Sequence, residues 1–249
     1  MADNGNDRKS DFRYATGDAT VPWAAIGEHI WHEDLMGLVR LLVKPHGDEA
    51  AFEGAVTEFE EALTSLCACG RPTAKLSLGD TVKQLEQETA DFLGCKHACF
   101  VTNATAGFQI GHQFADLGPG DEVILPAITF IATAAYPPNV GAKCVFADVD
   151  PRTVNMDPED VARKVTERTK VIMPVHIGGY PVDMDPIMEI AEENDIIVIE
   201  DAAHAFGGKY KGRMIGTIGH FGSFSFHEVK NITSFEPTPL NSDRSLSAI

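Results

Sequence analysis

Basic residues are scarce in this sequence: 20 Lys and Arg stand against 37 Asp and Glu, for a formal net charge of −17. Nucleic acids are bound through clustered Lys and Arg that neutralise the backbone phosphates. The composition therefore argues against a nucleic-acid partner, and the charge mainly favours solubility. With 249 residues, 44% of them hydrophobic, the chain is long enough to bury a full globular core.

The sequence also lacks a long apolar run. Residues 1–18 are polar, without the apolar stretch of a signal peptide, and no later run is long enough to span a bilayer. The five cysteines are an odd number in a long chain, which does not suggest a disulfide framework. Their spacings match no zinc signature well, so buried thiols are favoured over a metal site. We expect no membrane partner and a reducing, cytoplasmic location.

Composition and periodicity divide the chain into four segments. Residues 1–20 form a polar tail with predicted disorder, and residues 21–76, with apolar side chains at helical spacing, form a predicted helical arm. Within this arm, Trp23 and Trp31 are expected to be packing anchors. Residues 77–235 are the predicted large domain. Residues 236–249 are polar, contain two prolines and are predicted to be disordered.

Short apolar runs alternate with helical segments in residues 77–235. This alternation predicts an α/β fold, a mostly parallel sheet with helices on both faces. Ligands of such sheets bind beyond the carboxyl ends of the strands, so the residues after each strand are candidates for a site. The predicted strands are 98–102, 122–126, 143–149, 170–176, 196–201 and 221–226, and the predicted helices include residues 80–93, 104–116, 158–164 and 185–193.

Small residues follow the first predicted strand. Ala104 and Thr105 open a helix there, where free backbone amides, the helix dipole and the Thr105 hydroxyl could together bind a phosphate. Thr105 as a plain helix N-cap is equally well supported by the sequence alone. After the second strand, Phe130 could stack on a heterocycle, although an aromatic in this place is more often a core residue.

Two more candidates lie at the end of the fifth predicted strand and just after it. Asp201 ends it, and a carboxylate there needs a partner, which a pyridinium nitrogen would provide. A helix N-cap or a salt bridge explains an aspartate there equally well. His204, three residues on, could reach a ring oxygen or stack beside a ring. Three other histidines near strand ends, His176, His220 and His227, remain ambiguous.

The last candidates lie at the end of the sixth predicted strand and in the segment that follows it. A lysine amine held in a pocket can form a Schiff base with an aldehyde cofactor, and Lys230 stands in this place. Ser225 precedes it by five residues, close enough for its hydroxyl to bind the phosphate of the same cofactor. The candidates at the successive strand ends therefore favour pyridoxal 5'-phosphate as the cofactor.

Six stretches of the sequence carry a resemblance to a known family: GPGDEVI at 118–124, TFIAT at 129–133, FADVD at 146–150, PVH at 174–176, IEDAAHA at 199–205 and SFHEVKN at 225–231. They resemble the DegT/StrS-type aminotransferases, which are fold-type-I pyridoxal phosphate enzymes acting mostly on nucleotide-linked keto-sugars. The resemblance covers about residues 78–235. It implies that Lys230 forms the Schiff base, that Asp201 pairs with the pyridine nitrogen, and that Phe130 stacks on the ring.

The same resemblance implies that His204 lies by the ring oxygen and that Ala104, Thr105 and Ser225 hold the phosphate. The implied reaction moves an amino group from an amino acid, glutamate or glutamine, to a keto-sugar that is nucleotide-linked. Some relatives carry histidine in place of the lysine and remove a hydroxyl, so the presence of Lys230 favours transamination. A homodimer is also implied.

Beyond the lysine the sequence departs from the family pattern. Relatives continue with a Gly-Glu-Gly-Gly stretch and a small C-terminal domain of about a hundred residues or more. Residues 236–249 match neither feature, so we expect a truncated chain that lacks this domain. The alternative function is a catalytically inactive fragment that binds the cofactor or dimerises only. A nicotinamide-dependent enzyme is disfavoured, because no Gly-x-Gly-x-x-Gly follows the first predicted strand.

Overall fold

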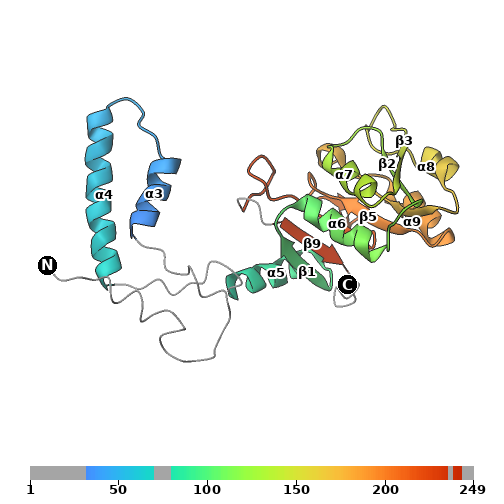
Figure 1. Ribbon diagram of the computed structural model, residues 1–249, viewed down its shortest axis with the longest axis horizontal. Helices are drawn as coiled ribbons and strands as arrows, with labels where there is room; N and C mark the ends of the chain where they lie inside the picture. The colour runs from blue at the N-terminus through green and yellow to red at the C-terminus, as the bar shows by residue number, and fades with distance from the viewer. Residues whose placement is uncertain (1–31, 70–79, 235–237, 243–249) are drawn as a thin grey trace. The chain divides into compact units, whose positions relative to one another are not determined.

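The computed structural model describes residues 32–69, 80–234 and 238–242. The chain forms two compact units, Met1–Asp80 and Thr81–Ile249, which are described separately (Figure 1). Our predictions for residues 1–20 and for the two tryptophans lie outside the described residues. No described helix combines the length and the apolar character needed to cross a membrane.

The described part of the first unit is a pair of helices, α3 (His32–Leu42) and α4 (Glu49–Cys69). Helix α4 is capped by Asp48, whose carboxylate accepts hydrogen bonds from the amides that open the helix. The two helices pack through Met36, Val56 and Leu63, which are all buried. Residues 32–42 and 49–69 of the predicted arm are therefore helical.

A seven-stranded sheet organises the second unit, with strand order β1-β9-β8-β5-β4-β2-β3. Strands β8, β5, β4, β2 and β3 run parallel, and β9 is antiparallel to both of its neighbours. A mostly parallel sheet was predicted, and it is confirmed. The strands are β1 (His97–Val101), β2 (Glu122–Pro126), β3 (Lys143–Ala147), β4 (Thr169–Ile172), β5 (Ile197–Asp201), β8 (Phe221–Ser223) and β9 (Thr238–Ser242).

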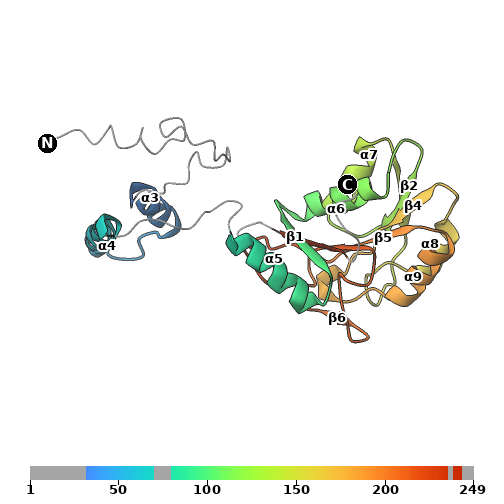
Figure 2. The ribbon, with the colours of Figure 1, turned by 90° about the horizontal axis from the view of Figure 1, so that it is seen from below.

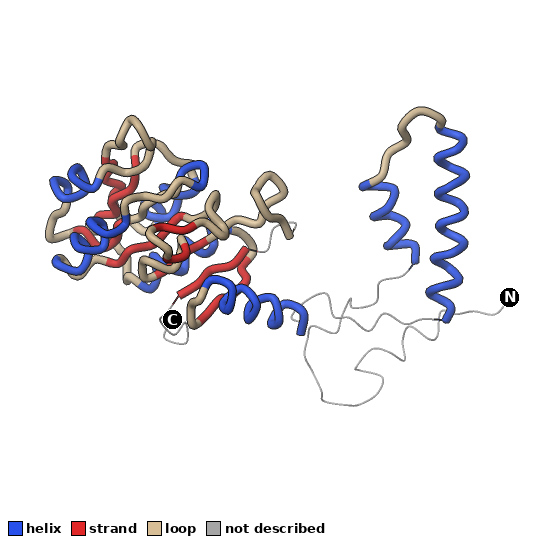
Figure 3. The backbone as a smooth tube through the Cα atoms, turned by 180° about the vertical axis from the view of Figure 1, so that it is seen from behind, coloured by secondary structure: helices blue, strands red, loops and turns tan. Residues whose placement is uncertain are grey.

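Helices cover both faces of this sheet, as predicted (Figures 2 and 3). Successive strand side chains point to opposite faces, so in β2 Ile124 belongs to one buried cluster and Val123 and Leu125 to the other. The first cluster includes residues of α8 and α9, and the second includes residues of α6. The helices are α5 (Asp80–Leu93), α6 (Ala104–Phe114), α7 (Ala132–Asn139), α8 (Pro158–Lys164) and α9 (Met184–Glu193).

The prediction of disorder over residues 236–249 is wrong for residues 238–242, which form β9. This strand lies between β1 and β8, so Leu240 is opposite Cys99 on one side and Ser223 on the other. Burial of Leu240, whose side chain has no exposed surface, and pairing on both sides stabilise the strand. The prediction of disorder had rested on the polar composition of residues 236–249 and on their two prolines, of which Pro239 lies within the strand.

Helix α6 lies close against the sheet because it carries glycine where it meets the strands. A Cβ atom at Gly107 would overlap the Ser223 hydroxyl, and one at Gly111 would lie 2.9 Å from Cδ1 of Ile199. The close packing holds the amino end of α6 beside the carboxyl ends of β8 and β5.

Some features were not predicted. Helix α7 contains Pro137 and Pro138, which hide it from a search for helical periodicity. The short hairpin of β6 (Lys209–Tyr210) and β7 (Arg213–Met214) was also missed. All five cysteines are free, and none is fully buried, so the expectation of buried thiols is wrong.

Candidate functional site

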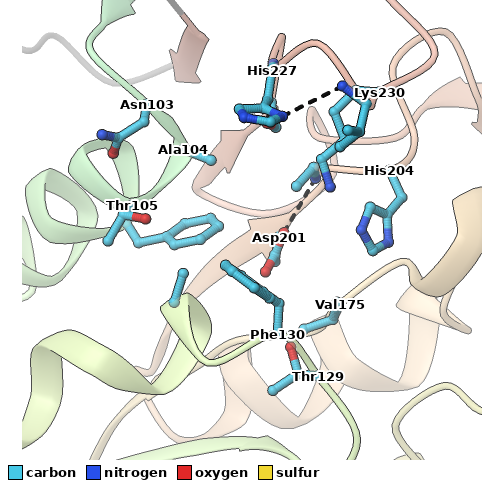
Figure 4. A pocket seen from close by; sticks show the side chains of 15 residues that line it. Asn103, Ala104, Thr105, Thr129, Phe130, Val175, Asp201, His204, His227 and Lys230 are labelled. Atoms are coloured by element: carbon cyan, nitrogen blue, oxygen red, sulfur yellow. Dashed lines mark hydrogen bonds between the residues drawn. The ribbon is translucent and has the colours of Figure 1, made fainter. Parts of the chain in front are cut away.

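A cavity of about 610 Å³ opens at the carboxyl ends of the parallel strands. All the candidates from the sequence line it, although they come from four separate segments of the chain (Figure 4). The lining candidates are Ala104, Thr105, Phe130, Asp201, His204, Ser225 and Lys230. His227, which the sequence left ambiguous, also lines the cavity, and sequence reasoning missed the other lining residues, which are Asn103, Phe108, Thr129, Ala132, Val175, Ala203 and Val229.

The amino end of α6 forms one wall of the cavity. Asn103 is the N-cap, and its side chain accepts a hydrogen bond of 3.0 Å from the Ala106 amide. The alternative in which Thr105 is the N-cap is therefore wrong. Ala104 and Thr105 are instead the first helical residues, whose amides have no acceptor within the helix. These amides, the helix dipole and the Thr105 hydroxyl make this wall attractive to an anion.

Asp201 lies deep in the cavity at the end of β5, and only 5% of the residue is exposed. Its Oδ2 accepts a hydrogen bond of 2.8 Å from the Thr133 hydroxyl, and its Oδ1 accepts one of 3.2 Å from the Ala203 amide. Burial raises the pKa of this carboxyl above its usual value, and the two hydrogen bonds oppose that effect.

The alternative roles considered for Asp201 do not occur in the described structure. No helix begins after Asp201, so it is not an N-cap. No salt bridge to Asp201 forms among the described residues, although nearby histidines favour its charged form weakly. Asp201 is thus a buried carboxylate whose charge is only partly compensated.

Lys230 approaches from the loop that follows β8, and its side chain points toward Asp201 (Figure 4). The Lys230 amide donates a hydrogen bond of 3.0 Å to the carbonyl of His227, which fixes the loop. His204 lies beside them, and its Nδ1 accepts a hydrogen bond of 3.4 Å from the Gly178 amide. Burial, and then the charge of Lys230, lower the pKa of His204, so its imidazole is neutral near pH 7 with the proton on Nε2.

Phe130 is 70% exposed at the cavity wall. The interpretation of this ring as a core residue is therefore wrong, and the ring is free to stack on a planar ligand. Ser225 lines the cavity from the segment after β8, where its Oγ accepts a hydrogen bond of 3.4 Å from the His227 amide. The cavity thus combines an anion-binding wall, an exposed ring, a buried carboxylate and a lysine amine.

Known proteins are similar to this chain in sequence. The DegT/DnrJ/EryC1/StrS aminotransferase family matches residues 57–237. Spore coat polysaccharide biosynthesis protein SpsC of Bacillus subtilis is 45% identical over 68% of this chain and 43% of its own length. GDP-perosamine synthase of Caulobacter vibrioides is 43% identical over 64% of this chain and 43% of its own.

Solved structures share the fold. An aminotransferase from Psychrobacter cryohalolentis matches with a TM-score of 0.66 and 41% identity, over 68% of this chain and 43% of its own. The PLP form of a putative sugar aminotransferase from Streptococcus pneumoniae matches with a TM-score of 0.64 and 33% identity, over 67% of this chain and 46% of its own. The chain thus spans less than half the length of these relatives. It belongs to the DegT/DnrJ/EryC1/StrS aminotransferase family.

Proposed function

We propose that the described cavity binds pyridoxal 5'-phosphate and that the protein transfers an amino group from an amino acid to a keto-sugar. The observation that carries this proposal is the convergence of Lys230, Asp201 and the amino end of α6 on one cavity. Family membership supports the reaction class, and the PLP form of the pneumococcal relative supports the cofactor.

The cavity residues fit the cofactor in charge and shape. The buried Asp201 carboxylate lacks a salt-bridge partner among the described residues, so a protonated ring nitrogen would stabilise it. The amino end of α6 suits the phosphate, because the helix dipole and the amides of Ala104 and Thr105 favour an anion. The exposed ring of Phe130 provides a flat surface for an aromatic ligand.

Each of these residues would have a separate task. When bound, pyridoxal phosphate supplies an electrophilic aldehyde and an electron-withdrawing ring. Lys230 would hold the aldehyde carbon through Nζ and, once displaced by the amino donor, take the proton from the donor's α-carbon. Asp201 would keep a proton on the ring nitrogen, and the neutral His204 can donate a hydrogen bond from Nε2 to the ring oxygen. Thr105 and Ser225 would bind the phosphate.

The names of relatives support the substrate class. One relative is a GDP-perosamine synthase, and the structure of DesI was solved in the presence of its TDP-sugar product. We propose a nucleotide-linked keto-sugar as the acceptor and glutamate or glutamine as the donor. A protein that binds the cofactor without turnover is the second candidate, because the relatives contain more than half of their length outside the match.

We further propose a cytoplasmic homodimer. Phe130 and Val229, which are 70% and 73% exposed, stand at the cavity wall, and Ile131, which follows Phe130 in the chain, is 73% exposed. Exposed apolar side chains at a cavity support contact with a second copy. The free cysteines agree with a reducing compartment. Sedimentation of the purified protein with and without Val229→Asp tests the dimer, which the variant should weaken.

Titration with pyridoxal phosphate tests binding, and added glutamate tests turnover. We expect a visible absorption band that is weakened in Asp201→Ala, and bleaching of the band by glutamate or glutamine. Amination of a nucleotide-linked keto-sugar should then restore it. A band that no amino donor bleaches supports the binding-only candidate, and no band in the unaltered protein contradicts the proposed cofactor.

A further inference from the structure

Two threonine hydroxyls connect the cavity wall to the buried carboxylate. Oγ1 of Thr129 lies 2.7 Å from Oγ1 of Thr133, which lies 2.8 Å from Oδ2 of Asp201. Thr129 lines the cavity, whereas Thr133 has no exposed surface and does not line it. Thr133 is placed by the first turn of α7, where its amide donates to the Phe130 carbonyl.

The direction of these hydrogen bonds follows from the charge on Asp201. A hydroxyl has one proton, and an ionised carboxylate can only accept. With Asp201 ionised, Thr133 donates to Asp201 and Thr129 must donate to Thr133. With Asp201 protonated on Oδ2, the carboxyl can donate to Thr133, and the direction of the pair can reverse. The pair thus holds Asp201 most strongly when it is charged, because hydrogen bonds to a charged acceptor are about twice as strong.

We propose that Thr133, oriented by Thr129, is a positioning residue that keeps the Asp201 carboxylate ionised and aimed at a cationic ring nitrogen. This inference rests on the proposed function, which identifies that ring as the cofactor's. The hydroxyl acts through Asp201 and touches no ligand itself. The only other hydrogen bond to the Asp201 side chain among the described residues comes from the Ala203 amide.

Other titratable groups face the same carboxyl. His204 and His176 would favour its ionisation when protonated, and Lys230 points toward it across the cavity. Burial opposes ionisation and is the largest influence on the pKa of Asp201. Among the groups that lower this pKa, the hydroxyl of Thr133 has the largest effect. Removal of this hydroxyl should therefore raise the pKa of Asp201 even though the other groups remain.

The first experiment needs no cofactor. Carbon NMR follows the titration of the Asp201 carboxyl, assigned by its loss in Asp201→Asn. We expect Thr133→Val to raise the titration midpoint by about one pH unit, because a hydroxyl donor favours the charged form. Thr133→Ser retains the hydroxyl and should restore the midpoint. An unchanged midpoint in Thr133→Val, or an equal rise in Thr133→Ser, overturns the proposal.

The second experiment measures pyridoxal phosphate affinity and the pH dependence of the bound absorption band. Thr133→Val should bind about tenfold more weakly, and its loss of binding on lowering the pH should shift to higher pH in step with Asp201, whereas Thr133→Ser should bind like the unaltered protein. Thr169→Val is the control, because Thr169 is also buried and accepts a hydrogen bond from the Thr166 amide at the start of β4. Equal weakening in the control overturns the positioning role. Failure of the unaltered protein to bind contradicts the proposed function instead, and the titration still decides the role of Thr133.

Discussion

Nε2 of His176 lies 3.0 Å from Oε2 of Glu200, and neither side chain has any exposed surface. Nδ1 of His176 accepts a hydrogen bond from the Val182 amide, so the proton of the neutral ring is on Nε2 and is donated to Glu200. Glu200 precedes Asp201 in β5, and the two carboxylates point to opposite faces of the sheet.

Glu200 also accepts hydrogen bonds from backbone amides of the segment before β8. The donors are Gly216 at 2.8 Å, Ile218 at 2.7 Å and Gly219 at 2.6 Å. One buried carboxylate therefore joins the segment after β4, the end of β5 and the approach to β8, and all three segments lead into the cavity. A buried charge is tolerated here because each oxygen is satisfied.

Glu200→Gln should destabilise the protein by about 2–4 kcal/mol, because one oxygen becomes a donor that faces other donors. Urea unfolding measures the loss. Glu122→Gln is the matched control, since Glu122 is also buried but its partner Arg168 is 59% exposed, and we expect a loss of about 1 kcal/mol. Equal losses in the two variants would show that the amides around Glu200 are not the cause of the lower stability of Glu200→Gln.

The buried His112 makes stability depend on pH. Nδ1 lies 2.7 Å from the Phe108 carbonyl, Nε2 has no partner among the described residues, and burial lowers the pKa of His112 from 6.5 to about 4. The unfolded chain therefore binds a proton below pH 6.5 that the folded protein does not take up until about pH 4. Stability should fall across this window by up to about 3 kcal/mol.

His112→Leu removes this titration, so only the unaltered protein should lose stability as the pH falls from 7 to 4. The unfolding free energy of the variant minus that of the unaltered protein should therefore increase over this range. Above pH 7 the difference should be constant. A difference that does not change with pH would mean that His112 is protonated in the folded protein. Urea unfolding at several pH values, at one salt concentration, makes the measurement.

Gly107→Ala should be destabilising by about 2 kcal/mol or more, because the added methyl group would overlap the Ser223 hydroxyl beneath α6. The amino end of α6 should move away from the sheet, so pyridoxal phosphate should also bind more weakly. Gly118→Ala is the control, since no atom lies within 4 Å of an added Cβ there. Thermal unfolding and cofactor titration of both variants test the close packing of α6.

Thr105→Val should lower the affinity for pyridoxal phosphate about tenfold, by the loss of one hydrogen bond to a charged group. The affinity for pyridoxal, which lacks the phosphate, should be unchanged. The two ligands therefore separate a phosphate contact from a general change in the cavity. Equal weakening for both ligands would remove Thr105 from the phosphate site.

Much of the fold follows from local patterns. Strand β2 and helix α8 have the predicted bounds, because one is a run of buried residues and the other begins with Pro158 and ends in basic residues. Strand β8 ends three residues earlier than predicted, since Phe224 and Phe226 remain buried without continuing the ladder. Strand β9 could not be predicted, because its pairing depends on distant strands rather than on its own residues.

The site likewise contains residues that local patterns predict and residues whose place depends on distant parts of the chain. Residues at strand ends could be predicted to meet, because parallel strands share an edge. Thr133 could not, since its hydroxyl reaches Asp201 only through the packing of α7, a helix that its prolines conceal. Thr105 was the N-cap considered from the sequence, and the hydrogen bond that Asn103 accepts from the Ala106 amide shows that the cap is Asn103 instead.

The central claim is that Lys230 holds pyridoxal phosphate in this cavity. Borohydride reduction of the protein with the cofactor, followed by peptide mass spectrometry, tests it directly. We predict that the reduced cofactor is attached to the peptide containing Lys230, and that Lys230→Ala abolishes the attachment while the protein remains folded. Attachment at other lysines only, or equal attachment in Lys230→Ala, would contradict the account.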